Sequence, residues 1–203
     1  MTMWRMKAGR GVIALALAMG LGGCVKTHNL DMSVPPPGLR PQIGGADEIA
    51  AKVSISDQRL DQTTIGTGHA QGNRLILVAN QPLPDVIRRG IETELAAYGF
   101  GIGNGPPYLL VDIAKADSSS HSPAPFAIDV WAEVELKASV LNAEGGTIYA
   151  KTYRGVDEGK AGNIWNGLDE AKPQLEKVLA MTIHAMVEDD SMVRALFSAR
   201  PRR

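Results

Sequence analysis

The feature that most constrains the fold is an alternation of side chains over residues 126–140. Every second position is apolar, and charged or hydroxyl side chains fill most of the positions between. The apolar set is Phe126, Ile128, Val130, Ala132, Val134, Leu136, Ala138 and Val140. Successive side chains of a strand point to opposite faces, so this period of two predicts one long strand with a buried face and a wet face.

Four more strands are expected, at residues 52–56, 74–79, 108–116 and 147–156. A hairpin at 142–146 joins the long strand to 147–156. If odd positions pair with odd, Ile148, Ala150 and Thr152 continue the buried face of the sheet. Tyr149 and Tyr153 then share the outer face with Trp131.

Apolar side chains at spacings of three and four predict helices over 84–98 and 173–188, and a last short helix over 190–197. The long helices have one apolar face each, which needs a sheet to cover. We therefore expect an α+β two-layer sandwich. Its sheet has about five mainly antiparallel strands, and two main helices lie on one face.

The first 23 residues have the arrangement of a signal peptide. Arg5, Lys7 and Arg10 supply positive charge, and residues 11–21 are apolar but too short to span roughly 30 Å of hydrocarbon. The single cysteine, Cys24, follows Leu21-Gly22-Gly23, which resembles a lipobox. We predict that residues 1–23 are cleaved and that acyl chains such as palmitate on Cys24 hold the chain to a membrane.

Residues 24–48 are predicted to be the lipidated cysteine and a Pro-rich tether, and residues 49–203 a single α+β domain. Consecutive prolines favour polyproline II, so the tether would hold the domain tens of ångströms from the membrane, at about 3.1 Å per residue. In the alternative, part of it packs on the domain as an irregular strand. Val25, where an inner-membrane retention signal would have Asp, favours the outer membrane, with the domain facing the periplasm.

Charge and motifs exclude several function classes. Without residues 1–23 the chain has 18 basic and 22 acidic residues, which argues against a nucleic-acid partner. The glycines of residues 99–105 follow a predicted helix instead of preceding one, so they do not form a phosphate loop. His184 is expected to pair with Glu188, and no histidines or cysteines have metal-ligand spacing. We expect no enzyme, no cofactor and no metal.

Two sets of side chains are candidates for a contact surface. Asp57 and Arg59 directly follow the first predicted strand, where they form either an exposed ion pair at a turn or a recognition patch. Trp131, Tyr149 and Tyr153 form an aromatic trio on the predicted outer face. The trio is either a contact surface or a satellite core covered by the tether or a loop.

Several short motifs, in this order, resemble the YajG family of uncharacterised outer-membrane lipoproteins. After the lipobox they are Val53-Ser54-Ile55-Ser56-Asp57-Gln58-Arg59, Asp61-Gln62, Tyr98-Gly99-Phe100, Gly103-Asn104-Gly105-Pro106, Thr152-Tyr153-Arg154-Gly155 and Asp190-Ser191-Met192-Val193. They cover about residues 50–197. The resemblance implies a lipid-anchored envelope protein but no catalytic residues.

The expected function is an accessory or binding module of the cell envelope, anchored to the membrane through Cys24, with an envelope protein as the candidate partner. The alternative is a lipoprotein that binds cell-wall or glycolipid fragments. A flat exposed aromatic surface would favour the first, and a concave pocket with convergent polar groups the second. A pair of titratable groups with perturbed pKa values in a cleft would instead favour an enzyme.

Overall fold

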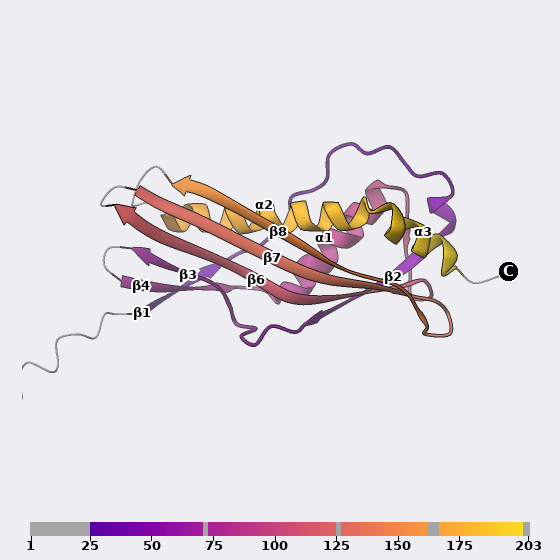
Figure 1. The fold of residues 1–203 in the computed structure, drawn as a ribbon, viewed down its shortest axis with the longest axis horizontal. Helices are drawn as coiled ribbons and strands as arrows, with labels where there is room; N and C mark the ends of the chain where they lie inside the picture. Colours follow the sequence, from indigo (N-terminus) through magenta and orange to yellow (C-terminus); the bar gives the residue numbers. More distant parts are fainter. Residues whose placement is uncertain (1–24, 71–72, 125–126, 162–166, 201–203) are drawn as a thin grey trace, which may run out of the picture.

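The computed structural model describes residues 25–70, 73–124, 127–161 and 167–200. In these residues a twisted sheet of eight strands packs against helices (Figure 1). The strands are β1 (Val25–Leu30), β2 (Ala50–Asp57), β3 (Thr64–Ala70), β4 (Asn73–Ala79), β5 (Gly101–Ile102), β6 (Tyr108–Ala124), β7 (Ala127–Leu141) and β8 (Thr147–Ala161). The helices are α1 (Leu83–Ala97), α2 (Gly167–Val187), α3 (Asp190–Ser198) and a short 3₁₀ turn, η1 (Ala46–Glu48).

The α+β class is confirmed, but the sheet has more strands than the five expected and is a mixed sheet. The long ladders β6–β7 and β7–β8 are antiparallel, as is β3–β4. The pairs β1–β4, β2–β5, β2–β6 and β3–β6 are parallel. Parallel pairs join segments that are distant in sequence, so no local hairpin pattern in the sequence predicts them.

Strand β6 is the centre of this topology because three strands pair with it. On one edge it pairs with β7. On the other edge β2 pairs with residues 108–113, and β3 pairs with Gly66 opposite Ser118 and Thr67 opposite Ser119. The sheet therefore divides beside residues 114–117 of β6, and we call this gap the fork.

The observed hairpin register differs by one residue from the expected pairing of odd positions with odd, so that expectation is wrong. Val140 pairs with Tyr149 and Leu136 with Tyr153, so even positions of β7 meet odd positions of β8. The cause is an irregularity after Val140, since the next pair is Leu141 with Thr147 and Ile148 is an extra residue. A one-residue slip moves every side chain to the other face. Tyr149 and Tyr153 thus lie on the helix-covered face, and Ile148, Ala150 and Thr152 are exposed.

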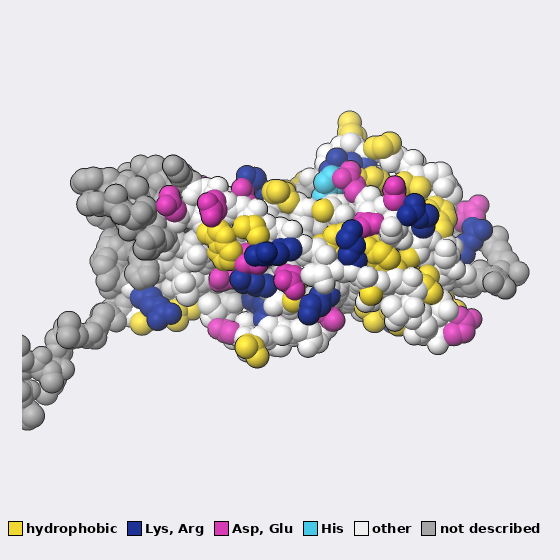
Figure 2. All heavy atoms as spheres, viewed as in Figure 1, with side chains coloured by type: hydrophobic (Ala, Val, Ile, Leu, Met, Phe, Trp, Pro, Cys, Tyr) yellow, Lys and Arg dark blue, Asp and Glu magenta, His cyan; other side chains and the backbone are white. Residues whose placement is uncertain are grey.

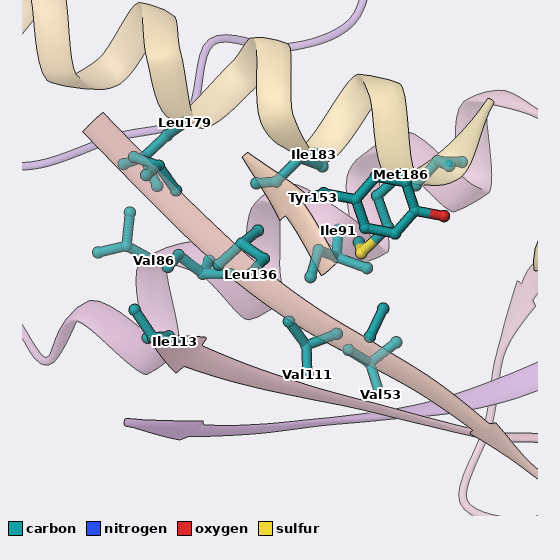
Figure 3. Packing of buried hydrophobic residues seen from close by; sticks show 14 of the residues in the cluster. Val53, Val86, Ile91, Val111, Ile113, Leu136, Tyr153, Leu179, Ile183 and Met186 are labelled. Carbon is teal, nitrogen blue, oxygen red and sulfur yellow. The ribbon is translucent and has the colours of Figure 1, made fainter. Parts of the chain in front are cut away.

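The core lies between the sheet and the helices α1 and α2. The even positions of β7 from Val130 to Val140 are buried as predicted, and Val134 and Leu136 are fully inaccessible. Phe126, at the start of the predicted alternation, lies outside the described residues. Figure 3 shows Ile183 and Met186 of α2 above the sheet, with Tyr153 beside them and Ile91 of α1 nearby. The predicted helices 84–98 and 190–197 match α1 and α3 closely, and α2 begins before residue 173.

Residues 25–48, most of the predicted tether, pack on the domain. Residues 25–30 form β1, which pairs in parallel with β4 along its whole length, and Leu30 and Met32 are buried. Residues 31–45, which we call the strap, then run over α1 and α2. Ser33 donates to Glu176 of α2, and the Ile43 N–H donates to the Tyr98 carbonyl after α1. Residues 25–48 are therefore part of the folded unit, and the packing alternative describes them better than a free tether.

Candidate functional site

Asp57 and Arg59 fill the fork of the sheet. The Arg59 Nε and Nη2 atoms donate to the two carboxylate oxygens of Asp57 at 2.9 and 2.8 Å. The same guanidinium donates to the carbonyls of Gln62, Thr64 and Ala116 at 3.0, 2.8 and 3.2 Å. Ala116 belongs to the stretch of β6 that neither β2 nor β3 pairs. Arg59 therefore supplies the donors that a neighbouring strand would supply elsewhere.

The expectation that Asp57 and Arg59 form part of an exposed contact surface is wrong. Their side chains are only 8% and 6% exposed. A planar guanidinium can satisfy a carboxylate and several carbonyls at once, and here all of these partners are internal. The motif Asp57-Gln58-Arg59 thus has a structural role, because it stabilises the sheet at the point where β2 and β3 separate.

Tyr149 and Tyr153 also have a structural environment. Tyr153 is buried, and its hydroxyl donates to Asp189 Oδ2 at 3.0 Å and contacts the Tyr149 hydroxyl. Lys151 pairs with the same carboxylate oxygen, while Oδ1 of Asp189 accepts the N–H groups of Ser191 and Met192 as the N-cap of α3. Two members of the predicted trio therefore fasten α3 to β8 and do not form an outer surface with Trp131.

The pKa values of this cluster shift in the directions that the contacts require. The hydrogen bond from Lys151 holds the pKa of Asp189 far below its usual range. Burial, the Tyr149 hydroxyl and the Asp189 carboxylate raise the pKa of Tyr153 well above that of a free tyrosine. At neutral pH the tyrosines are therefore neutral donors to a charged acceptor.

The third aromatic residue, Trp131, does lie on the outer face of the sheet. With Lys115, Asp117, Glu133 and Arg154 it forms what we call the outer-face cluster. Lys115 Nζ lies 5.1 Å from the centre of the Trp131 ring. The Glu133 carboxylate accepts from Lys115 Nζ at 2.5 Å and from Arg154 Nε at 2.6 Å. Figure 2, viewed as Figure 1, shows basic and acidic side chains interleaved with hydrophobic ones over the middle of the molecule.

Burial is uneven within the outer-face cluster. The Glu133 side chain is 5% exposed, whereas Lys115 and Arg154 are 44% and 60% exposed. Burial alone would raise the pKa of Glu133, but the hydrogen bonds from Lys115 and Arg154 outweigh it and lower the pKa. Burial raises the pKa of Asp117, which faces Glu133 across β6 and β7. The buried Glu133 carboxylate thus holds two accessible cations in place, and a half-buried indole lies beside them.

A second polar group lies on the helix side, where the strap crosses α1 and α2. His184 contacts Glu94 through Nδ1 and Glu188 through Nε2, both at 2.8 Å, and the predicted pairing with Glu188 is confirmed. The Tyr98 hydroxyl donates to Glu188 at 2.8 Å, and burial raises the pKa of Tyr98 to about 12. Beside Tyr98 and Glu188 an open hollow of about 440 Å³ is lined by Ile43 of the strap and by Val193 of α3.

Within the described ranges, no three His, Cys, Asp or Glu side chains gather as metal ligands would. Among the helices of those same residues, none is long and apolar enough to cross a bilayer. The predicted lipidation site, Cys24, lies outside the described residues and directly precedes β1.

Sequence reasoning missed two parts of these sites. Glu133 and Lys137 look alike as polar positions of an alternating strand, and only the paired strands show that cations from β6 and β8 cover Glu133. Asp189 was missed because the sequence analysis predicted the helix over 190–197 without assigning the residue before it as the N-cap. The spacing Asp189-x-x-Met192 before an apolar stripe was the available signal.

Comparisons with known proteins place the fold and the family. No curated protein has significant sequence similarity to the chain. The solved structure of protein XCC0632 from Xanthomonas campestris, of family DUF330, has a TM-score of 0.59 at 13% identity, covering 86% of this chain and 99% of that one. This similarity shows a shared fold.

A minor lipoprotein from Acinetobacter baumannii gives a TM-score of 0.46 at 10% identity, covering 70% of this chain and 92% of its own. A family described as "Uncharacterized lipoprotein" matches residues 41–196, which is most of the chain. The resemblance found in the sequence is therefore confirmed, and the chain belongs to the YajG-type family of uncharacterised lipoproteins.

Proposed function

We propose that the protein is a lipid-anchored accessory module of the cell envelope that binds a protein partner and catalyses no reaction itself. It faces the periplasm from the outer membrane. The observation that supports this role is the outer-face cluster, which lies on long strands with the helices on the opposite side of the sheet.

The cluster combines groups that favour protein contact. A tryptophan and an arginine are the residue types that most often dominate binding energy, and both are partly accessible here. Because Glu133 fixes the two cations, little side-chain freedom remains to be lost on binding. The two cations and the two carboxylates of the cluster would favour a partner with complementary charges, which affects specificity and register more than affinity.

Location is supported by the sequence. The Leu21-Gly22-Gly23-Cys24 segment fits lipid attachment, and the family is one of lipoproteins. Val25 in place of Asp favours the outer membrane. These features support the periplasmic placement that a partner of the envelope requires.

Site-specific photo-cross-linking in cells tests the proposal. A photoreactive residue at Thr152 or Val156, both exposed and next to the cluster on β8, is expected to give a discrete adduct with an envelope protein. The same residue at Thr93, exposed on α1, is the matched control and is expected to give none. Trp131→Ala should keep the melting temperature and lose the adduct.

Tyr153→Phe is the complementary variant. It should lower the free energy of unfolding by about 2 kcal/mol, because a hydroxyl bonded to a charged group is lost, and should keep the adduct. Equal adducts from Thr152 and Thr93, or an adduct unaffected by Trp131→Ala, would contradict the proposed surface.

A second candidate function rests on the hollow beside Tyr98 and Glu188. Its concave shape and its lining by Ile43, Val193 and Tyr98 suit a ligand with apolar and hydroxyl groups, such as a cell-wall or glycolipid fragment. Titration with such fragments, with Val193→Trp as a filled-hollow control, distinguishes this candidate from the first.

A further inference from the structure

We propose that the end of the molecule where β1 begins is a membrane-docking surface, and that the domain stands upright on the bilayer that holds its lipid. This inference rests on the lipid anchoring that is part of the proposed function, and it adds an orientation to it. The partner is the lipid surface itself.

The first argument is that no spacer separates the anchor from the fold. Val25, the residue after Cys24, already pairs with Arg74, and all six residues of β1 pair in register with β4. Consecutive Cα atoms are 3.80 Å apart, so the first Cα atom of the sheet is about 4 Å from the Cα atom of the cysteine that would carry the lipid.

The second argument is that the ends of several strands gather at this end. Ala70 pairs with Asn73, Ala124 with Ala127, and Ile128 with Ala161, so the last residues of β3, β6 and β8 and the first residues of β4 and β7 lie at the same end as the start of β1. Figure 1 shows this end opposite the one that carries α3. An attachment at one tip of an elongated domain favours contact through that tip.

The third argument is charge and exposure at the attachment point. Lys26 and Arg74 are exposed on neighbouring strands, and the Val25 side chain is 57% exposed. A basic side chain near an anionic bilayer contributes about 1 kcal/mol of attraction, and an exposed valine there loses contact with water. These side chains would therefore reinforce the lipid anchor.

The orientation has a consequence for the outer-face cluster. Strand β7 runs from the docking end to the far end, and 15 residues at about 3.3 Å each give roughly 50 Å. Trp131 and Glu133 are four and six residues from its start, which places them about 13–20 Å above the docking end. A protein that binds the cluster must then approach close to the membrane.

The test uses the acylated protein in vesicles of phosphatidylethanolamine and phosphatidylglycerol. Because the thiol of Cys24, the one cysteine of the chain, carries lipid, a single introduced cysteine accepts a fluorophore selectively. The three exposed positions are Thr27→Cys on β1, Thr152→Cys on β8 opposite Lys137 of β7, and Ala143→Cys in the far-end turn. Energy transfer to an acceptor on the lipid headgroups should be strong at 27, weaker at 152 and lost at 143.

A control variant has a long Gly-Ser spacer between Cys24 and Val25. It should lose the difference between positions 27 and 143, because the domain can then turn freely. Equal transfer at 27 and 143 in the protein without the spacer, or a profile that the spacer leaves unchanged, overturns the proposed orientation. Flotation of the same samples reports the anchor separately, and protein that does not float with vesicles overturns both the anchoring and the orientation.

Discussion

Asp57 and Glu133 are both buried carboxylates that bond to an arginine, yet the two arginines have opposite surroundings. Arg59 is 6% exposed, and its remaining donors reach three backbone carbonyls in the fork. Arg154 is 60% exposed, and Glu133 shares its charge with Lys115 as well. The first arginine thus completes the backbone of the sheet. The second is a surface group that a buried carboxylate holds in place. Both carboxylates are buried, so the burial of the arginine is what distinguishes a structural ion pair from one that can contact a partner.

The largest effect is expected from Arg59→Ala. It leaves the Asp57 carboxylate buried without its arginine and removes a donor from each of the carbonyls of Gln62, Thr64 and Ala116. Removing one partner of a buried pair costs about 3–5 kcal/mol. Urea unfolding at neutral pH measures the loss. Arg59→Lys is the control for charge, and it should also be destabilised because one ammonium cannot reach the same set of acceptors. If Arg59→Ala were as stable as the wild type, the Asp57–Arg59 pair would contribute no more than an ordinary surface ion pair, and the structural role proposed for it would be contradicted.

The double variant Lys115→Met with Arg154→Met examines the other carboxylate. Glu133 then keeps its burial but loses the hydrogen bonds that lower its pKa. In the wild type the folded pKa lies below the unfolded one, so Glu133 stabilises at neutral pH and this contribution is lost as pH falls through the folded pKa. In the double variant burial raises the folded pKa, so the sign reverses.

Relative to wild type, the double variant should lose about 2 kcal/mol at neutral pH and regain part of it on acidification towards about pH 4. Urea unfolding across that pH range checks this, and Glu133→Gln in the same background should abolish the pH-dependent difference. A constant deficit at every pH would show that packing, and not charge, holds the cluster.

Gly66→Ala tests how closely the backbones of β3 and β6 must approach beside the fork. A Cβ at Gly66 would overlap the Ser118 carbonyl, where β3 first pairs with β6. Separating the strands should cost about 1–3 kcal/mol, as overpacking does. Gly38→Ala in the strap, where a Cβ meets nothing within 4 Å, is the matched control and should leave the melting temperature unchanged.

The smallest effect is expected from Arg154→Ala alone. Exposed ion pairs contribute about 0–1 kcal/mol, and Lys115 still neutralises Glu133. The melting temperature should change little, while the cross-linked adduct from Val156 should weaken. A loss of stability equal to that of Arg59→Ala would remove the distinction between the two arginines.

Local periodicity was enough to predict the even face of β7, α1, α3 and the α+β class. These features depend on residues close in sequence. The alternation that ends at Val140 allows only one face of the long strand to be the buried one. The missed strands β1, β3 and β5 are short or polar and owe their existence to partners far away in sequence. The strand expected over residues 108–116 continues to Ala124 in β6, because β7 pairs with the additional polar residues on one edge.

The errors about the candidate site have one origin. A single extra residue, Ile148, decided on which face Tyr149 and Tyr153 lie, and no side-chain pattern marked it because Ile148 and Tyr149 suit either face of a strand. Arg59 was equally ambiguous, because its role depends on a carbonyl 57 residues further along the chain. Side chains whose function is to satisfy distant backbone groups cannot be identified from local sequence.

The parallel pairing of β1 with β4 also determines how the protein would resist mechanical force. A pull on the anchor acts at the first residue of β1 and along the strand, so that β1 is drawn lengthwise past β4 and is not peeled away from it. In this shear geometry the hydrogen bonds of all six paired residues share the load and must fail together. A domain attached in this way would withstand tension between the membrane and a bound partner, because forced unfolding is governed by the rate at which such a barrier is crossed.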